Sequence, residues 1–360
     1  MNEPGINISF TEKASTAISR GERGIIAMII RDSLPSGDRM MEIVREKDIP
    51  KTFSAASIRQ IKNARKGYIN PPKKVIVYCL STGMEDVEET GGYTEALNAL
   101  EAVRFHYLVA PTCETDGQTE TIAAWVGEMR ENGKMIKAVL PNTAADKEYI
   151  INYTTESVTD AGGNTYSAEG YCSRIAGLIA GTPMTISCTY APLGELVDCT
   201  RLGRQERKTA MGKGQFLLYH DGEKVKVYAG VTSLVTLTEE KGEQFQKIRI
   251  VDAMDMIAED IRRTAEDSYI GKYANSYDNK CVLISGITSY LKGLGRAVVS
   301  DYSVMIDIEA NRTFLEEHGT DTAELSDNEV KQAPTGNKVY LSATVKLLDA
   351  MEEIHLPIMI

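Results

Sequence analysis

The sequence is poor in aromatic residues, in histidine and in long apolar runs. Only 7% of its 360 residues are aromatic, with a single tryptophan, and four are histidine. The longest aliphatic run, residues 25–30, is far shorter than the ~18 residues that a bilayer-spanning helix needs, so we expect no membrane insertion. The opening residues MNEPGINISF lack the basic and apolar regions of a secretory signal. These absences predict a chain that is made and kept in the cytosol.

Cysteine is present, but not in pairs that suggest a shared role. None of the six cysteines forms a C-x-x-C motif, and two lie inside the apolar runs VIVYCL (75–80) and TISCTY (185–190). Such thiols are commonly buried and free rather than bound to metal or joined in disulfides. No histidine stands at zinc-ligand spacing from a cysteine or from another histidine. His106 lies in an apolar run, which favours a core position over a role as a catalytic base.

The common signatures of catalysis and nucleotide binding are also missing. G-x-G-x-x-G, G-x-x-x-x-G-K-[ST] and G-x-S-x-G do not occur. The nearest glycine-rich fragments, residues 212–214 and 293–295, favour turns, and the acidic run 85–89 favours a solvated loop over a cation site. With 51 acidic and 40 basic residues the net charge is -11, which disfavours direct binding to nucleic acid. We therefore assign no catalytic, cofactor-binding or metal-binding residue.

Short apolar runs alternate with helical patterns from residue 25 to about residue 190. This alternation predicts a βαβ-type sheet that is buried on both faces, with right-handed crossovers. Residues 33–72 break the pattern and are interpreted as an insertion or subdomain with one short helix at 55–64. The pair Gly177 and Gly181 favours close packing of a helix on the sheet. The predicted strands are 25–30, 75–80, 105–110, 135–140 and 185–190, with apolar helix positions within 97–103, 122–129 and 171–179.

Beyond residue 192 the pattern changes to a hairpin followed by long helices. Asp221 and Gly222 stand between two short apolar segments, which is typical of a hairpin turn. Residues 250–265 carry apolar side chains on one stripe, so an amphipathic helix is expected, and a second helix should end at Gly295. Further strands are expected at 304–308 and 339–347, with a solvated acidic loop at 316–338 between them.

Both ends of the chain carry strand-like alternation without a local partner. Pro357 has no N–H group, so the last strand can pair fully along one side only. Soluble monomers normally blunt exposed apolar edge strands, and two such strands therefore predict strand pairing between chains. The alternative is that both arms fold back into their own sheet. The candidate inter-subunit arm residues are Ile6, Ile8 and Phe10 at one end and Ile354, Leu356, Ile358 and Ile360 at the other.

Four segments, taken in order, resemble one family of proteins. They are the Pro4–Ile8 arm, KIRIVDAMDMIAEDIRRTAEDSYIGKYANSYDNK (247–280), ISGITSYLKGLGRAVVSDYSV (284–304) and VYLSATVKLLDAMEEIHLPIMI (339–360). In this order they are similar to the tail sheath proteins of contractile phage tails and R-type bacteriocins. The resemblance implies a structural, non-enzymatic subunit that forms stacked hexameric rings around an inner tube. The arms would add strands to neighbouring subunits, and contraction would drive the tube through a cell envelope.

The resemblance also implies how the chain is organised. The fold would combine α/β and α+β structure, with a central βαβ-type sheet domain and a C-terminal mixed α+β domain carrying extended strand arms. The implied partners are other copies of the chain, the inner tube protein, and baseplate and tail terminator proteins. The implied division is an N-terminal arm at 1–22, an outer domain at 23–230, a packing domain facing the tube at 231–349 and a C-terminal arm at 350–360.

The surface that faces the tube would belong to the C-terminal domain. The exposed face of the helix at 250–265 is then the candidate surface, and residues 11–24 and 349–353 would be the hinges that absorb the motion. The residues alone leave open an alternative, a cytosolic α/β enzyme or ligand-binding protein with its site at the carboxyl ends of the parallel strands. The candidate tube-facing charges are Asp255, Glu259, Arg262 and Arg263.

Overall fold

The computed structural model describes residues 18, 23–33, 38–81 and 91–359. The chain forms two compact units. We name them the sheet unit, whose described residues lie within 21–259 and 349–360, and the C-terminal unit, Asp260–Leu348. Both units contain helices and strands, which confirms the predicted combination of α/β and α+β structure.

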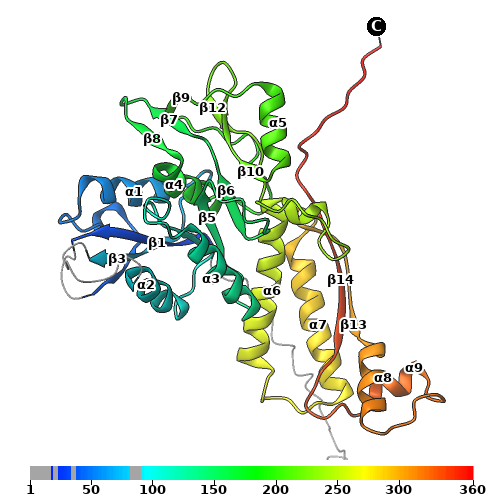
Figure 1. Ribbon diagram of the computed structural model, residues 1–360. Helices are drawn as coiled ribbons and strands as arrows, with labels where there is room; N and C mark the ends of the chain where they lie inside the picture. Colours follow the sequence, from blue (N-terminus) through cyan, green and yellow to red (C-terminus); the bar gives the residue numbers. More distant parts are fainter. Residues whose placement is uncertain (1–17, 19–22, 34–37, 82–90, 360) are drawn as a thin grey trace, which may run out of the picture. The chain divides into compact units, whose positions relative to one another are not determined.

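The sheet unit is built on seven strands. They are β1 (Ile25–Asp32), β2 (Met40–Ile43), β3 (Lys74–Ser81), β4 (Tyr107–Val109), β5 (Lys137–Pro141), β6 (Ile150–Tyr153) and β10 (Gln215–Phe216). Their order is β10-β6-β5-β4-β1-β3-β2, and every neighbouring pair is parallel except β2 with β3. Figure 1 labels β1, β3, β5, β6 and β10 of this sheet. Four of the five apolar runs predicted as strands thus form β1, β3, β4 and β5.

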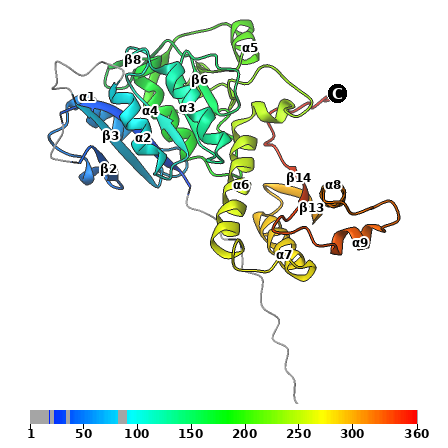
Figure 2. The same cartoon turned by 60° about the horizontal axis from the view of Figure 1, so that its bottom comes forward.

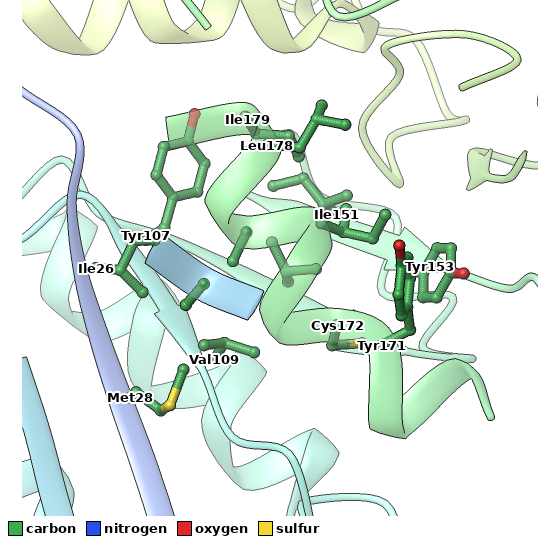
Figure 3. Packing of buried hydrophobic residues seen from close by; sticks show 14 of the residues in the cluster. Ile26, Met28, Tyr107, Val109, Ile151, Tyr153, Tyr171, Cys172, Leu178 and Ile179 are labelled. Carbon is green, nitrogen blue, oxygen red and sulfur yellow. The ribbon is translucent and has the colours of Figure 1, made fainter. Parts of the chain in front are cut away.

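Helices cover both faces of this sheet, as the apolar runs predict. One core layer contains α1 (Ala55–Arg65) and α4 (Ala168–Ala180), and the other contains α2 (Gly91–Glu101) and α3 (Thr119–Glu131). Successive residues of β1 belong to alternate layers, with Ile26 and Met28 in the first and Ile25 and Ala27 in the second. Figure 3 shows part of the first layer, where Ile26 and Met28 lie in one cluster with Val109 of β4 and side chains of α4. Because successive side chains of a strand point to opposite faces, β1 contributes side chains to both core layers.

Helix α4 packs closely against α1 and the loop after it, because the residues of α4 and its C-terminal end at the contact are glycines. A Cβ atom at Gly177 would come within 2.1 Å of the Ala64 carbonyl oxygen, and one at Gly181 would come within 2.1 Å of the Asn70 carbonyl oxygen. Glycine permits this approach because it has no side chain. The predicted close contact is therefore present, but its partner is α1 and the loop after it rather than the sheet.

Two predictions for the sheet unit are wrong. The insertion 33–72 contains α1, as expected, but it also supplies β2, an edge strand that pairs antiparallel with β3. Residues 185–190 form a loop instead of a buried strand. Tyr190 ends this loop with a φ of 58°, which an extended strand does not allow, and the hydroxyls of Ser187 and Thr189 bond within it.

Smaller elements complete the sheet unit. A short 3-10 helix η1 (Glu46–Asp48) follows β2, and a second one, η2 (Glu243–Gln246), precedes the first long helix. The predicted hairpin turn at Asp221 and Gly222 joins two antiparallel strands, and Gly222 adopts a φ of 109°. The remaining elements are β7 (Ser157–Asp160), β8 (Thr165–Ser167) and β9 (Leu196–Cys199) in one antiparallel sheet, the hairpin strands β11 (Leu218–His220) and β12 (Val225–Val227), and α5 (Arg204–Gly212).

The C-terminal unit contains the end of α6, the long helix α7 and a two-stranded antiparallel sheet (Figure 2). Its elements are the second part of α6 (Ile248–Ser268), α7 (Tyr277–Leu294), β13 (Val299–Ile306), α8 (Ile308–Glu317), α9 (Asp327–Gln332) and β14 (Leu341–Leu347). Gly295 follows α7 with a φ of 76°, which confirms the predicted end of that helix. None of the described helices combines the length and apolar character that crossing a bilayer requires.

Two predictions for the C-terminal unit are corrected by capping interactions. Ile308 does not continue β13 but begins α8, because the Asp307 carboxylate accepts a hydrogen bond from the Ala310 N–H at 2.9 Å. The acidic stretch 316–338 is not only a loop, since α9 lies within it. Ser326 and Glu329 form a capping box that starts α9. Some acidic residues in this part of the sequence therefore cap helix N-termini, and others lie in solvent-exposed loops.

Candidate functional site

The C-terminal tail presents apolar side chains to solvent. Ile354, Leu356 and Ile358 are 82%, 74% and 76% exposed, and residues 348–359 belong to no strand of this chain. Nothing in the described part of the sheet unit covers these side chains. Ile360 and the N-terminal arm residues lie outside the described residues; the arm residues are Ile6, Ile8 and Phe10.

The beginning of the same tail is held in place. The Glu352 carboxylate accepts a hydrogen bond from Thr189 Oγ1 at 2.5 Å, lies 2.9 Å from Ser187 Oγ and forms an ion pair with Lys247. The expected hinge at 349–353 stays a prediction, and one of its side chains, Glu352, is bound in this structure. The unbound part of the tail begins after Glu352.

Asp255 lies in a buried group of charges rather than on an exposed helix face. It is only 4% exposed, and Arg130 binds both of its carboxylate oxygens, at 2.7 and 3.0 Å. The Lys137 ammonium pairs with Asp255 and lies 2.9 Å from Asp252, which also accepts a 2.5 Å hydrogen bond from the Tyr107 hydroxyl. Burial alone would raise the pKa of Asp255, but Lys137 and Arg130 outweigh burial and lower it. The prediction of an exposed Asp255 is wrong, because these partners fix the first turns of α6 to the sheet.

Glu259 is half-buried and paired one turn further along α6. The Arg104 guanidinium donates to it at 2.6 Å, and His106 Nε2 lies 3.7 Å from its other oxygen. Burial alone would raise the pKa of Glu259, but the neighbouring His106 and Arg104 groups lower it to about 2. Burial lowers the pKa of His106, whose Nδ1 accepts the Ile25 N–H at 3.2 Å. His106 is a core residue, as expected.

Arg262 and Arg263 belong to the C-terminal unit and are more accessible. The Arg262 side chain is 48% exposed and donates to Glu266 at 2.9 Å, one turn ahead. Arg263 lies 3.4 Å from Asp260 and is partly exposed. The four predicted charges thus do not form one exposed face, because Asp255 is buried and Glu259 is half-buried, whereas Arg262 and Arg263 are more accessible.

Sequence reasoning missed the buried partners of α6. Lys137 interrupts the apolar run MIKAVL (135–140), and a lysine within a predicted two-faced strand is a signal that an acidic partner must exist. The identity of that partner depends on which segment packs against the strand, since Asp255 is 118 residues away in the chain.

Models of two domains of one family match the chain. The phage tail sheath protein central domain matches residues 87–233, and the phage tail sheath C-terminal domain matches residues 240–360. Together these ranges cover more than half of the sequence.

Individual proteins of phages and bacteria are similar to this chain as well. A tail sheath protein of Clostridium phage phiCD119 is 37% identical over 359 residues, which cover 98% of this chain and 97% of that protein. The XkdK protein of the phage-like element PBSX of Bacillus subtilis is 32% identical over 188 residues, which cover 51% of this chain and 40% of that protein.

Solved structures share the fold. The sheath tail protein of Desulfitobacterium hafniense has a TM-score of 0.69 at 21% identity, covering 84% of this chain and 94% of that one. A sheath complex of the extracellular contractile injection system PVC, in its contracted state, has a TM-score of 0.66 at 12% identity, covering 100% and 98%. With both domains matched and a relative 37% identical over nearly its whole length, the chain belongs to the phage tail sheath protein family, the structural subunits of phage tails and related contractile particles.

Proposed function

We propose that this chain assembles into stacked six-fold rings around an inner tube, and that its terminal arms link the rings by adding strands to neighbouring subunits. Contraction of this sheath would drive the tube through a cell envelope without any catalytic step in the chain. The work would come from exchanging one set of subunit interfaces for a more stable set. The proposed partners are further copies of the chain, the tube protein, and baseplate and terminator proteins, after synthesis in the bacterial cytoplasm.

The exposed tail is the observation that carries this proposal. Ile354, Leu356 and Ile358 alternate along the chain, so an extended tail places them on one face. Burying three aliphatic side chains is worth roughly 5 to 9 kcal/mol before costs. Ordering the tail and docking a subunit offset a comparable amount. Each link is then modest, and repetition over many subunits makes the assembly stable.

The C-terminal unit offers a surface that could receive such a strand. Strands β13 and β14 pair only with each other among the described residues, so each leaves one edge for a further strand. A hollow of about 660 Å³ adjoins the beginning of β14. Its apolar and aromatic lining includes Tyr269, Tyr273, Leu283, Val339 and Leu341. We propose this unit as the receiver of a neighbour's arm.

The tube would meet exposed charges of α6. Among the candidate residues, Arg262 keeps the most exposed side chain, and Arg263 lies beside it in sequence. These two arginines are the positions that we carry forward for contact with the tube. Asp255 is set aside because it is buried and paired.

The test uses the two faces of the tail as matched variants. Ile354→Lys with Leu356→Lys charges the apolar face, whereas Glu353→Lys with His355→Lys adds charge to the alternate positions, whose side chains are 89% and 85% exposed. Assembly is followed by negative-stain microscopy and sedimentation velocity. We expect the first variant to stay a folded small species and the second to form cylinders like the unaltered chain. Cylinders from the first variant would contradict the arm proposal.

A further inference from the structure

The site that holds Glu352 is preorganised by the sheet unit. Thr189 Oγ1 accepts the Gly230 N–H at 2.9 Å, and the Thr189 N–H donates to Ser187 Oγ at 3.1 Å. Ser187 Oγ lies 3.0 Å from Thr189 Oγ1 and 2.9 Å from the carboxylate, so its single hydrogen can serve either oxygen. Lys247 supplies the positive charge and immediately precedes α6. Two hydroxyls and an ammonium therefore converge on one carboxylate.

The hold is confined to the start of the tail. The Glu352 side chain is 17% exposed, whereas Met351 is 93% exposed and Ile354 is 82% exposed. Burial alone would raise the pKa of Glu352, but Lys247 and the hydroxyl donors lower it, so the carboxylate is charged at neutral pH. Asp349 adds a second, longer contact, 3.9 Å from the Arg249 guanidinium. Beyond Glu352 the described tail has only exposed side chains.

Glu352 is separated from Ile354, Leu356 and Ile358 by even numbers of positions. In an extended chain Glu352, Ile354, Leu356 and Ile358 fall on one face, because side chains alternate with a period of two. A register shift of one residue would turn the apolar set to the opposite face. Fixing the direction of Glu352 therefore fixes the face that the next six residues, about 20 Å of extended chain, present.

We propose that Glu352 is a positioning residue, which clamps the root of the C-terminal arm to its own subunit and sets the face that the arm's apolar side chains offer to a neighbour. The role of the arm in this statement rests on the proposed function. The clamp itself does not, because it lies within one chain. Tension on an arm would pass through Glu352 to Lys247 and so to the first residue of α6.

Anchoring is measured first, in a chain kept unassembled by Ile354→Lys and Leu356→Lys. Spin labels on noncanonical residues at His355 and at the exposed Gln205 of α5 report the spread of the distance between tail and sheet unit. Glu352→Ala should lose the narrow component of this distribution, and Glu352→Gln should lose part of it. Glu353→Ala, an exposed carboxylate next door, should keep it. An unchanged distribution in Glu352→Ala would overturn the clamp, whatever the state of the assembly proposal.

Positioning is then measured in the chain with its natural arm. One alanine inserted after Glu353 moves the apolar side chains to the other face, and two alanines restore the phase. We expect the one-residue insertion to lose cylinder formation and the two-residue insertion to regain it, with Glu352→Ala removing this difference. Equal assembly by both insertions would overturn the positioning role. If the unaltered chain forms no cylinders, the proposed function fails, while the distance measurement still decides whether the clamp exists.

Discussion

Replacing Asp255 with asparagine tests the buried charges of α6 most directly. The change keeps the shape of the side chain but removes the charge that Arg130 and Lys137 share. Breaking a buried ion pair from one side costs about 3 to 5 kcal/mol, because the remaining charge stays buried without compensation. We expect Asp255→Asn to lower the free energy of unfolding by that amount at pH 7.

Urea unfolding followed by circular dichroism gives this free energy. The chain should also carry Ile354→Lys and Leu356→Lys, so that assembly does not contribute. The midpoint should fall while the slope with urea stays the same, since the surface exposed on unfolding is unchanged. Arg262→Gln is the matched control, because an exposed pair contributes at most about 1 kcal/mol.

The pH dependence of the same variant has a definite sign. The folded pKa of Asp255 lies below its ordinary value of 3.8, so its charge stabilises the fold above that value. The stabilisation is lost as the pH falls through the lowered folded pKa. The difference between the unaltered chain and Asp255→Asn should therefore shrink on acidification below about pH 4. A difference under about 1 kcal/mol at pH 7, or one that stays constant in acid, would refute the reasoning.

Three further predictions concern packing, thiols and capping. Gly177→Ala should destabilise the subunit by about 1 to 3 kcal/mol because its Cβ would strike the α1 backbone, whereas Gly293→Ala, with open space around it, should be neutral or stabilising by thermal melts. Cys281 is the one cysteine that is not buried, so it should react with a thiol reagent first, and the other five should react only on unfolding. Cys188 is an example, because burial raises the pKa of its thiol to about 12. Fast labelling of several thiols would contradict this prediction. Asp307→Ala should cost about 1 kcal/mol by removing the cap of α8, and no change in urea midpoint would count against that role.

Elements that depend on local pattern could be predicted from the sequence. The run 25–30 is apolar at every position, and its residues do alternate between two core layers. Gly295 ends its helix because the positive φ there suits glycine. Residues 185–190 have the same apolar and β-branched composition as a strand, yet hydroxyl bonds and the turn at Tyr190 decide their conformation. Composition alone does not contain that information.

In the candidate site, too, features set by local sequence could be predicted, and features set by long-range packing could not. The alternation of Ile354, Leu356 and Ile358 is local, and their exposure fits the predicted arm. Helix periodicity placed Asp255 outside the apolar stripe, but buried partners from α3 and β5 turned it into an interior residue. The clamp on Glu352 was equally hidden, since it needs a lysine 105 residues earlier. Long-range ion pairs are set by packing, which a single sequence does not specify.

The lengths of the strands limit where this protein can be extended by another chain. Every outermost strand in the described sheets of the sheet unit has two to four residues, from β10 at two to β2 and β9 at four. Strands β13 and β14 have eight and seven residues. A strand from another chain forms few backbone hydrogen bonds with a short edge strand and binds it weakly. Short edge strands therefore disfavour unspecific pairing between sheets of different chains. Under the proposed strand addition, this difference in edge length would favour ordered growth at β13 and β14 over unspecific aggregation.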